Sequence, residues 1–234
     1  MSSHFRVLAL LIPALAVMAA EGDPAPAPVP EAEPAPAPAA RAEEKADTSL
    51  LNNLDLRLTL GGGGGISTVE NDDTDTEVDY EDGEGGTLAV HLIYLRARPG
   101  GVGFAVGGGL FAHSYDGEPE GSDITSTVNA TGIDIYAAFV WRPTRNWHFE
   151  LPAVVLSAGS AVVETEGAED SETGGYARFA GQLGAYYTFD FGLQLGLDIG
   201  AAGFGTTVEE KSTNDEYTFS GGGGYLNVSV GYRF

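Results

Sequence analysis

Apolar side chains alternate with polar or small ones in segment after segment of this chain. The last segment shows the pattern most clearly, because every second residue is apolar or aromatic: Leu226, Val228, Val230, Tyr232 and Phe234. Successive side chains of a β-strand point to opposite faces, so this period of two predicts strands with one apolar and one polar face. Eight segments follow it, namely residues 54–67, 87–98, 102–115, 128–141, 147–163, 176–189, 193–206 and 217–234.

The apolar face is easy to assign in most segments, but two are irregular. In the second segment, Ile93 and Leu95 fall between the members of the apolar face, so its direction stays open. In the fifth, Pro152 cannot donate a ladder hydrogen bond, which predicts a bulge nearby. The residues of the fifth segment that are predicted to point outward are Trp147, Phe149, Leu151, Ala153 and Val155.

The connections between the segments are alternately short and long. Short turns rich in Pro, Gly or Asn are expected near residues 99–101, 142–146 and 190–192. The long connections hold 22 of the chain's 34 acidic residues and span residues 68–86, 116–127, 164–175 and 207–216. This alternation predicts an all-β fold, an eight-stranded antiparallel up-and-down β-barrel with an acidic end and a short-turn end. Each segment has the roughly ten residues that a tilted membrane-spanning strand requires.

Aromatic residues gather beside the predicted short turns, as they do where a barrel wall meets a membrane interface. The expected girdle consists of Tyr94, Phe104, Trp141, Trp147, Phe149, Tyr187, Phe189, Phe191, Tyr232 and Phe234. A soluble lipocalin-like barrel is the main structural alternative. It would turn the apolar faces inward and leave charged residues such as Arg57 and Asp198 outside.

The region before the barrel has a different composition. Residues 1–20 combine His4 and Arg6 with a short apolar run and small residues, which predicts a cleavable signal peptide. Residues 21–53 include a Pro/Ala-rich tract that cannot form a core, and we expect a disordered periplasmic linker. The chain has no cysteine, which excludes disulfides, thiol catalysis and cysteine-based metal sites.

The strand that ends on Phe234 resembles the C-terminal assembly signal of bacterial outer-membrane barrels, with Leu226, Val228, Val230 and Tyr232 on its outer face. More broadly, residues 54–234 resemble the small outer-membrane barrels of the OmpA transmembrane-domain and OmpX type. The resemblance implies an outer-membrane location, with the linker and C-terminus periplasmic and the acidic loops extracellular. It also implies lipids, lipopolysaccharide and the barrel-assembly machinery as partners. The chain departs from full-length OmpA-like proteins because it has no C-terminal peptidoglycan-binding domain.

Charged residues on the polar strand faces would meet inside so narrow a barrel. They can form a polar network that fills the lumen, because paired ions are tolerated where an isolated ion is very costly. A gated ion pore is the alternative, since moving one arginine from its partner would open a water path. The predicted network consists of Asp55, Arg57, Asp134, Glu150, Arg178, Asp198 and Arg233.

The first long connection is a candidate cation-binding loop, because hard divalent cations prefer several oxygen ligands. Val78 stands where an EF-hand loop needs glycine, and a solvated hairpin would show the same alternating acids. We therefore expect diffuse association with divalent cations rather than a specific metal site. The candidate ligands are Asp73, Asp75, Glu77, Asp79 and Glu84.

Two further features bear on function. His91, His113 and His148 are the only histidines after the predicted signal, and His113 beside Ser114 is the only neighbouring pair with a hydroxyl. Adjacent strand residues point to opposite faces, so this pair does not make a nucleophile and base.

Glycine runs at residues 61–65 and 221–224 should meet where the first and last strands close the barrel. They indicate either strong curvature and close backbone approach or a lateral opening.

Together these patterns predict a non-enzymatic outer-membrane barrel with a filled lumen, which stabilises the envelope and displays acidic loops for cation or surface contacts. A narrow ion or small-solute channel is the alternative, and a lipid A-modifying enzyme is a third hypothesis. No catalytic residue and no cofactor is expected. Nucleic acid is excluded as a partner, because the acidic loops would repel it.

Overall fold

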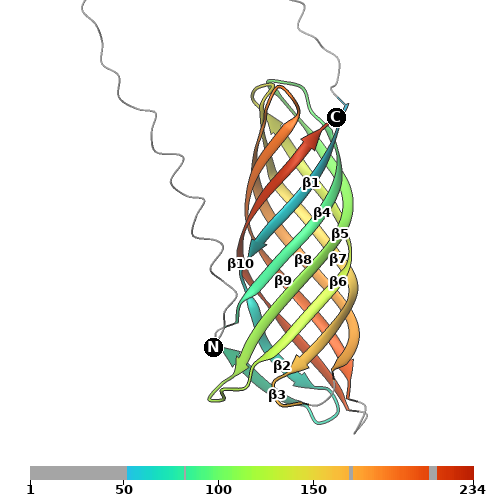
Figure 1. The fold of residues 1–234 in the computed structure, drawn as a ribbon, viewed down its shortest axis with the longest axis vertical. Coiled ribbons are helices and arrows are strands. Elements are labelled where there is room, and N and C mark those ends of the chain that lie inside the picture. Colours follow the sequence, from blue (N-terminus) through green and yellow to red (C-terminus); the bar gives the residue numbers. More distant parts are fainter. Residues whose placement is uncertain (1–51, 82, 169–170, 211–214) are drawn as a thin grey trace, which may run out of the picture. The chain divides into compact units, whose positions relative to one another are not determined.

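The computed structural model describes residues 52–81, 83–168, 171–210 and 215–234, and this part of the chain is all β (Figure 1). The predicted signal peptide, nearly all of the predicted linker and Lys211 lie outside the described residues. Among the described residues, no helix is long and apolar enough to cross a membrane. The strands are β1 (Asn52–Gly62), β2 (Gly65–Asn71), β3 (Thr76–Glu81), β4 (Gly85–Arg96), β5 (Gly101–Pro119), β6 (Ser126–Arg142), β7 (Trp147–Thr165), β8 (Glu172–Thr188), β9 (Leu193–Glu209) and β10 (Glu216–Arg233).

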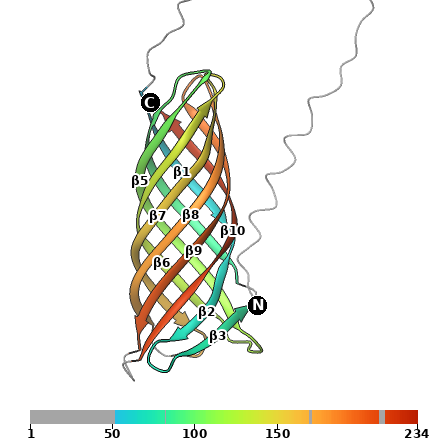
Figure 2. The same ribbon diagram turned by 180° about the vertical axis from the view of Figure 1, so that it is seen from behind.

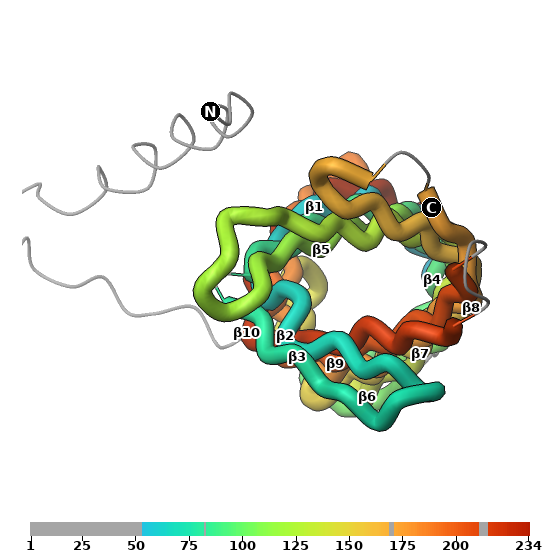
Figure 3. The backbone as a smooth tube through the Cα atoms, turned by 90° about the horizontal axis from the view of Figure 1, so that it is seen from below, coloured from blue at the N-terminus to red at the C-terminus, as the bar shows by residue number. Residues whose placement is uncertain are grey.

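These strands form an antiparallel barrel with eight strand positions around its ring, as predicted. β1 pairs with both β4 and β10, and β5 to β10 pair in sequence order, so the ring closes. Two positions are interrupted. The first position consists of β1 and then β2, and both of these strands pair with β10. The second consists of β3 and β4, and β3 lies between β2 and β5. Figure 3 shows the closed ring viewed along the barrel.

The exterior of the barrel wall is apolar, whereas the buried charged side chains point into an interior that they share with apolar and aromatic residues. Charged side chains inside and an apolar surface outside are the arrangement of a membrane-spanning barrel and the reverse of a lipocalin. On β1, Leu54, Leu56, Leu58 and Leu60 are each at least 40% exposed, whereas Arg57 between them is 2% exposed. β6, β8, β9 and β10, which are labelled in Figure 2, follow the same rule. In the ambiguous second segment, now β4, Ile93 and Leu95 point inward and are completely buried.

The outward face predicted for the fifth segment is correct only as far as Leu151. Beyond it, Ala153 and Val155 are buried, and Leu156 is 49% exposed. The pairing of β7 with β6 and with β8 shifts register across this point, where the Leu151–Pro152 peptide is cis. The expected bulge is therefore present. Because it adds a residue to one strand, it exchanges the inward and outward faces of everything that follows.

Strand pairing extends well into the predicted long connections. β5 to β10 are 17 to 19 residues long. A tilted strand of that length rises roughly 40 Å, against an apolar band about 25 Å tall. The predicted connection 68–86 is not loop throughout, because residues 65–81 contain the β2–β3 hairpin, which is the alternative that the alternating acids left open. Alternating Thr, Val and Tyr side chains have high strand propensity, which favours pairing even in this acidic segment.

The two glycine runs meet at the closure between the first and last strand positions, as predicted. Gly62 pairs with Leu226 and Gly65 pairs with Gly222, while Gly63 and Gly64 between them have no ladder partner on β10. Gly64 has a φ of 71°, and a Cβ added to it would collide with the backbone of Gly222. Glycine is required here because the backbone adopts a left-handed conformation at a close approach.

Candidate functional site in the barrel lumen

A salt bridge crosses the full width of the lumen at the level of β1 and β7, which lie on opposite sides of the ring. Arg57 of β1 donates two hydrogen bonds to Glu150 of β7, with Nη2 2.7 Å from Oε1 and Nη1 3.2 Å from Oε2. Both side chains are buried, with exposures of 2% and 0%. Bidentate, charge-assisted bonds are among the strongest hydrogen bonds in proteins. This pair therefore ties opposite walls together and occupies the barrel axis.

The remaining donors and acceptors of this layer are nearly all satisfied by neighbours. Asp55 accepts hydrogen bonds from Arg233 Nε at 2.7 Å and Arg233 Nη2 at 2.8 Å, and it lies 3.2 Å from Arg57 Nη2. Gln194 accepts from Arg57 Nε at 2.9 Å and donates to Asp55 at 3.2 Å. His148 Nε2 lies 3.4 Å from Glu150 Oε1. Four of the seven predicted network residues thus form one cluster, which we call the ionic layer: Asp55, Arg57, Glu150 and Arg233.

Two tyrosines complete the ionic layer. The Tyr136 hydroxyl donates to Glu150, and the Arg57 guanidinium lies over the Tyr186 ring with its Cζ 3.9 Å from the centroid. Tyr186 also donates to Asp198 at 2.5 Å, which attaches a fifth predicted residue to the edge of the layer. These tyrosines and Gln194 were not predicted as site residues. Their positions on the polar faces of their strands were the available signal.

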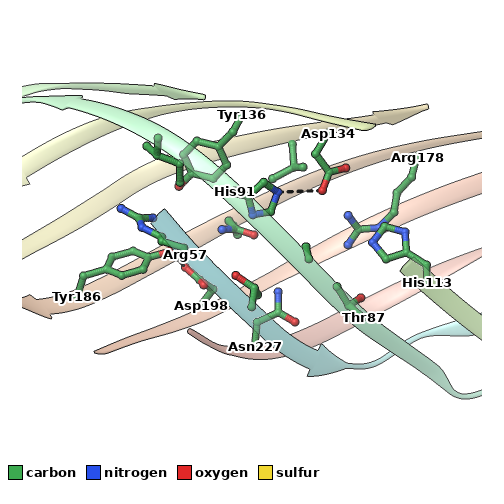
Figure 4. A pocket seen from close by; sticks show the side chains of 15 residues that line it. Arg57, Thr87, His91, His113, Asp134, Tyr136, Arg178, Tyr186, Asp198 and Asn227 are labelled. Atoms are coloured by element: carbon green, nitrogen blue, oxygen red, sulfur yellow. Dashed lines mark hydrogen bonds and ion pairs between the residues drawn. The ribbon is translucent and has the colours of Figure 1, made fainter. Parts of the chain in front are cut away.

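On the side of the ionic layer that is farther from the short turns lies a small chamber, which Figure 4 shows from close by. His91 Nε2 and Asp134 Oδ2 are 2.9 Å apart across it. Arg178 has its Cζ 5.4 Å from the centroid of the Tyr225 ring, and its Nε has no hydrogen-bond partner in the described part of the chain. The cavity measures about 30 Å³. That is room for one to three water molecules, but not for a continuous channel.

Aromatic side chains close the lumen on the far side of the chamber. The rings of Tyr115 on β5 and Phe204 on β9 stack with centroids 4.0 Å apart, although these strands lie on opposite sides of the ring. Tyr176 donates to Tyr115 at 3.3 Å, and its hydroxyl lies 3.0 Å from His113 Nδ1. We call Tyr115, Tyr176 and Phe204 the aromatic layer. The lumen is thus crossed by an ionic layer and an aromatic layer, with a water-sized chamber between them.

The candidate cation ligands lie on and beside the β2–β3 hairpin, which continues the barrel wall at its acidic end. Asp73 and Asp75 occupy its turn, Glu77 and Asp79 lie on β3, and Glu84 follows. Most of these side chains are exposed, and Asp73 Oδ2 accepts a hydrogen bond from the Glu216 amide at 2.9 Å. No group of three or more His, Cys, Asp or Glu residues within the described ranges is arranged to hold a metal ion.

The histidines are bound to partners other than serine. His91 pairs with Asp134, His113 with Tyr176, and His148 with Glu150. The Ser114 hydroxyl points away from His113 and donates to Asn129 at 2.8 Å. In the part of the chain that the structure describes, no histidine is therefore hydrogen-bonded to a serine hydroxyl, the contact that nucleophilic catalysis by serine uses.

Aromatic rings form a continuous outer belt beside the short turns. Trp141 and Trp147 both stack on Phe149, with centroid distances of 5.3 and 6.0 Å. Trp147 meets Tyr187 edge-on, and the belt continues through Phe189 to Phe191. On β10, Tyr232 packs against Phe234. We call this end of the barrel the short-turn rim.

An antiparallel barrel that is apolar outside, filled inside and edged with aromatic rings is a small transmembrane β-barrel. Solved structures of this kind are similar to it in fold. Neisserial surface protein A (NspA) has 14% identity, with 77% of this chain and 97% of that chain covered and a TM-score of 0.39. Ail of Yersinia pestis, solved with the heparin analogue sucrose octasulfate, has 15% identity, 78% and 99% coverage and a TM-score of 0.36.

The outer membrane protein OprG of Pseudomonas aeruginosa has 12% identity, with 79% of this chain and 97% of that chain covered and a TM-score of 0.34. At these identities the likeness concerns the fold alone. No protein-family model matches the chain, and no curated protein matches it in sequence.

Proposed function

We propose that the protein is a non-enzymatic bacterial outer-membrane barrel that stabilises the envelope and displays an acidic surface. The observation that carries this proposal is the bond between Arg57 and Glu150 across the lumen. A transport path would have to break it, and breaking a buried ion pair is costly because an unpaired charge is left in a low-dielectric interior. The aromatic layer gives a second, independent barrier.

Recording from a planar bilayer separates this proposal from the narrow channel. The protein, with insertion checked by its different gel migration when unheated, should give no conductance steps. Arg178→Gln should also be silent, because Arg178 belongs to neither the ionic nor the aromatic layer and its loss leaves both barriers in place. Reproducible steps from the unsubstituted protein would contradict a filled lumen and favour the channel.

The acidic end is proposed to face the cell exterior, and the short-turn rim with the linker the periplasm. The asymmetry of charge supports this orientation, since the acids of the long connections lie opposite the rim that carries Arg96, Arg98, Arg142 and Arg145. At the outer end, carboxylates such as Asp73 and Glu77 would share divalent cations with the phosphates of lipopolysaccharide. Calorimetry should find weak, salt-sensitive Ca²⁺ binding. A single tight site would instead indicate a built metal centre.

The outward residues of β10 are proposed to serve in assembly as well as in lipid contact. Leu226, Val228, Val230, Tyr232 and Phe234 are between 46% and 70% exposed, so little inside the barrel depends on them. Phe234→Ala should lower the amount of assembled protein in cells while leaving refolding of purified protein into vesicles unchanged. An equal loss in both settings would indicate a purely structural role.

The absence of an enzymatic role is also testable. Cells that produce the protein should have the same lipid A masses as cells that produce no barrel. A new lipid A species that disappears on replacing His91, His113 or His148 would support the enzyme hypothesis instead.

A further inference from the structure

The short-turn rim surrounds an open cavity of about 650 Å³ at the mouth of the barrel. It lies between the three short turns and the end of β10. Three arginines line it in a chain with a net charge of −23. The only acidic side chain among its described lining residues is Asp190, which accepts a hydrogen bond from Asn146 at 3.2 Å. The charged side chains that line the mouth are therefore mostly basic, although the chain as a whole is acidic.

Among these arginines, Arg142 has the buried charge that is least satisfied by its neighbours. Its side chain is buried, with 3% exposure, and its two terminal nitrogens donate only to backbone carbonyls, at 3.4 Å to Ala97 and 2.8 Å to Arg145. Its Nε has no hydrogen-bond partner among the residues that the structure describes. No carboxylate of the described residues forms an ion pair with Arg142. A buried cation without a counter-ion is unfavourable, so an anion in this cavity would be strongly preferred over an empty site.

Arg233 and Arg145 add donors to the same cavity. Asp55 accepts hydrogen bonds from Nε and Nη2 of Arg233. Nη1 of this side chain, which is 8% exposed, has no partner within the described ranges. Arg145 is exposed and also lines the cavity. Two buried guanidinium groups that line the cavity thus each keep one donor without a partner among the described residues, and the exposed Arg145 adds a third cation at its edge. Guanidinium groups match phosphate in geometry, and a phosphate group has enough oxygens to serve several of them.

We propose that the mouth of the barrel at the short-turn rim is a phosphate-binding site, held by Arg142, Arg145 and Arg233. The phosphate group belongs either to a free phosphate or to the headgroup of a lipid. Phe191 and Phe234 border the cavity and are 66% and 70% exposed, so a lipid at the interface would find apolar contacts beside the arginines.

Calorimetric titration of inorganic phosphate into the full chain in maltoside micelles, which contain no phosphate, tests the site. The protein should show saturable binding, and Arg145→Gln should weaken it roughly tenfold or more through loss of a charge-assisted hydrogen bond. Arg142→Lys keeps the charge but loses the fork of donors, so it should also weaken binding. Arg98→Gln is the matched control. It removes an exposed charge from the same rim without touching the cavity, and binding should be unchanged.

Absence of saturable binding by the unsubstituted protein would overturn the proposal. So would an equal loss in Arg98→Gln and Arg145→Gln, because binding would then reflect the general charge of the rim. Repeating the titration in vesicles identifies the source. Weaker phosphate binding in phosphatidylglycerol vesicles than in micelles supports the site with a lipid headgroup in it, and unchanged binding supports the site with free phosphate.

Discussion

The lumen is closed by individual side chains that contact one another across it. Arg57 makes the largest number of these contacts in the ionic layer. Its guanidinium contacts Glu150, Gln194, Asp55 and the Tyr186 ring. The sequence placed Arg57 and Glu150 correctly on inward faces, because both lie on strands with regular alternation up to that point. It did not pair them, because partners across a barrel depend on strand stagger, which side-chain alternation leaves undetermined.

Removing either member of this pair should destabilise the barrel, and the two losses should not add. Arg57→Met leaves the buried Glu150 carboxylate without its arginine, and Glu150→Gln leaves Arg57 only Asp55, which Arg233 also binds. Each single loss should cost about 3–5 kcal/mol. The double variant should lose clearly less than the sum of the two single losses. Urea unfolding in lipid vesicles, followed by tryptophan fluorescence, measures the coupling. Strictly additive losses would show that the two side chains do not interact across the lumen.

The glycine closure makes a second prediction for single residues. Gly64→Ala should destabilise the barrel by about 1–3 kcal/mol, because the new Cβ meets the Gly222 backbone and the residue has a positive φ. Gly86→Ala is its control, since no atom lies within 4 Å of a Cβ there. The same unfolding assay should find the control near the unsubstituted protein. Equal stability of both variants would mean that the closure tolerates side chains.

Among the strands, β7 shows where reasoning from alternation stops. Pro152 indicated a bulge, but its position alone did not give the number of residues doubled, so the facing of Ala153 and Val155 was assigned incorrectly. The prediction that the acidic connections are loops was incomplete for a related reason. Their charges suggested loops, whereas the pairing of residues such as Val69 with Val78 continues the wall beyond the apolar band. Charge predicts exposure to water, and an exposed segment can still be a strand.

Spin labels can test the exchange of inward and outward faces in β7. The chain has no native cysteine, so a single introduced cysteine carries the only label. A label on Leu151→Cys or Leu156→Cys should be accessible to oxygen dissolved in lipid. A label on Ala158→Cys should behave like the one on Leu156→Cys, since both positions are exposed after the bulge. Leu156→Cys protected from oxygen would contradict the bulge, because uninterrupted alternation from Leu151 would turn Leu156 inward.

At the scale of the whole molecule, the account rests on an apolar exterior in contact with lipid. The eight strand positions, the antiparallel order and the aromatic rim were predictable, because each follows from side-chain period, turn residues or composition. The layered filling of the lumen was not, because it depends on which strands face one another across the ring. Tyr115 and Phe204 illustrate this, since they are far apart in sequence and stack across the barrel.

Tryptophan quenching by brominated phospholipids tests the central claim most directly, because it needs no substitution. The chain has only two tryptophans, Trp141 and Trp147, which are 47% and 42% exposed on the outer belt of the short-turn rim. In vesicles, bromines near the headgroup end of the acyl chain should quench their fluorescence strongly, and bromines at the bilayer centre should quench it weakly. No quenching by either lipid would contradict a barrel that spans the membrane.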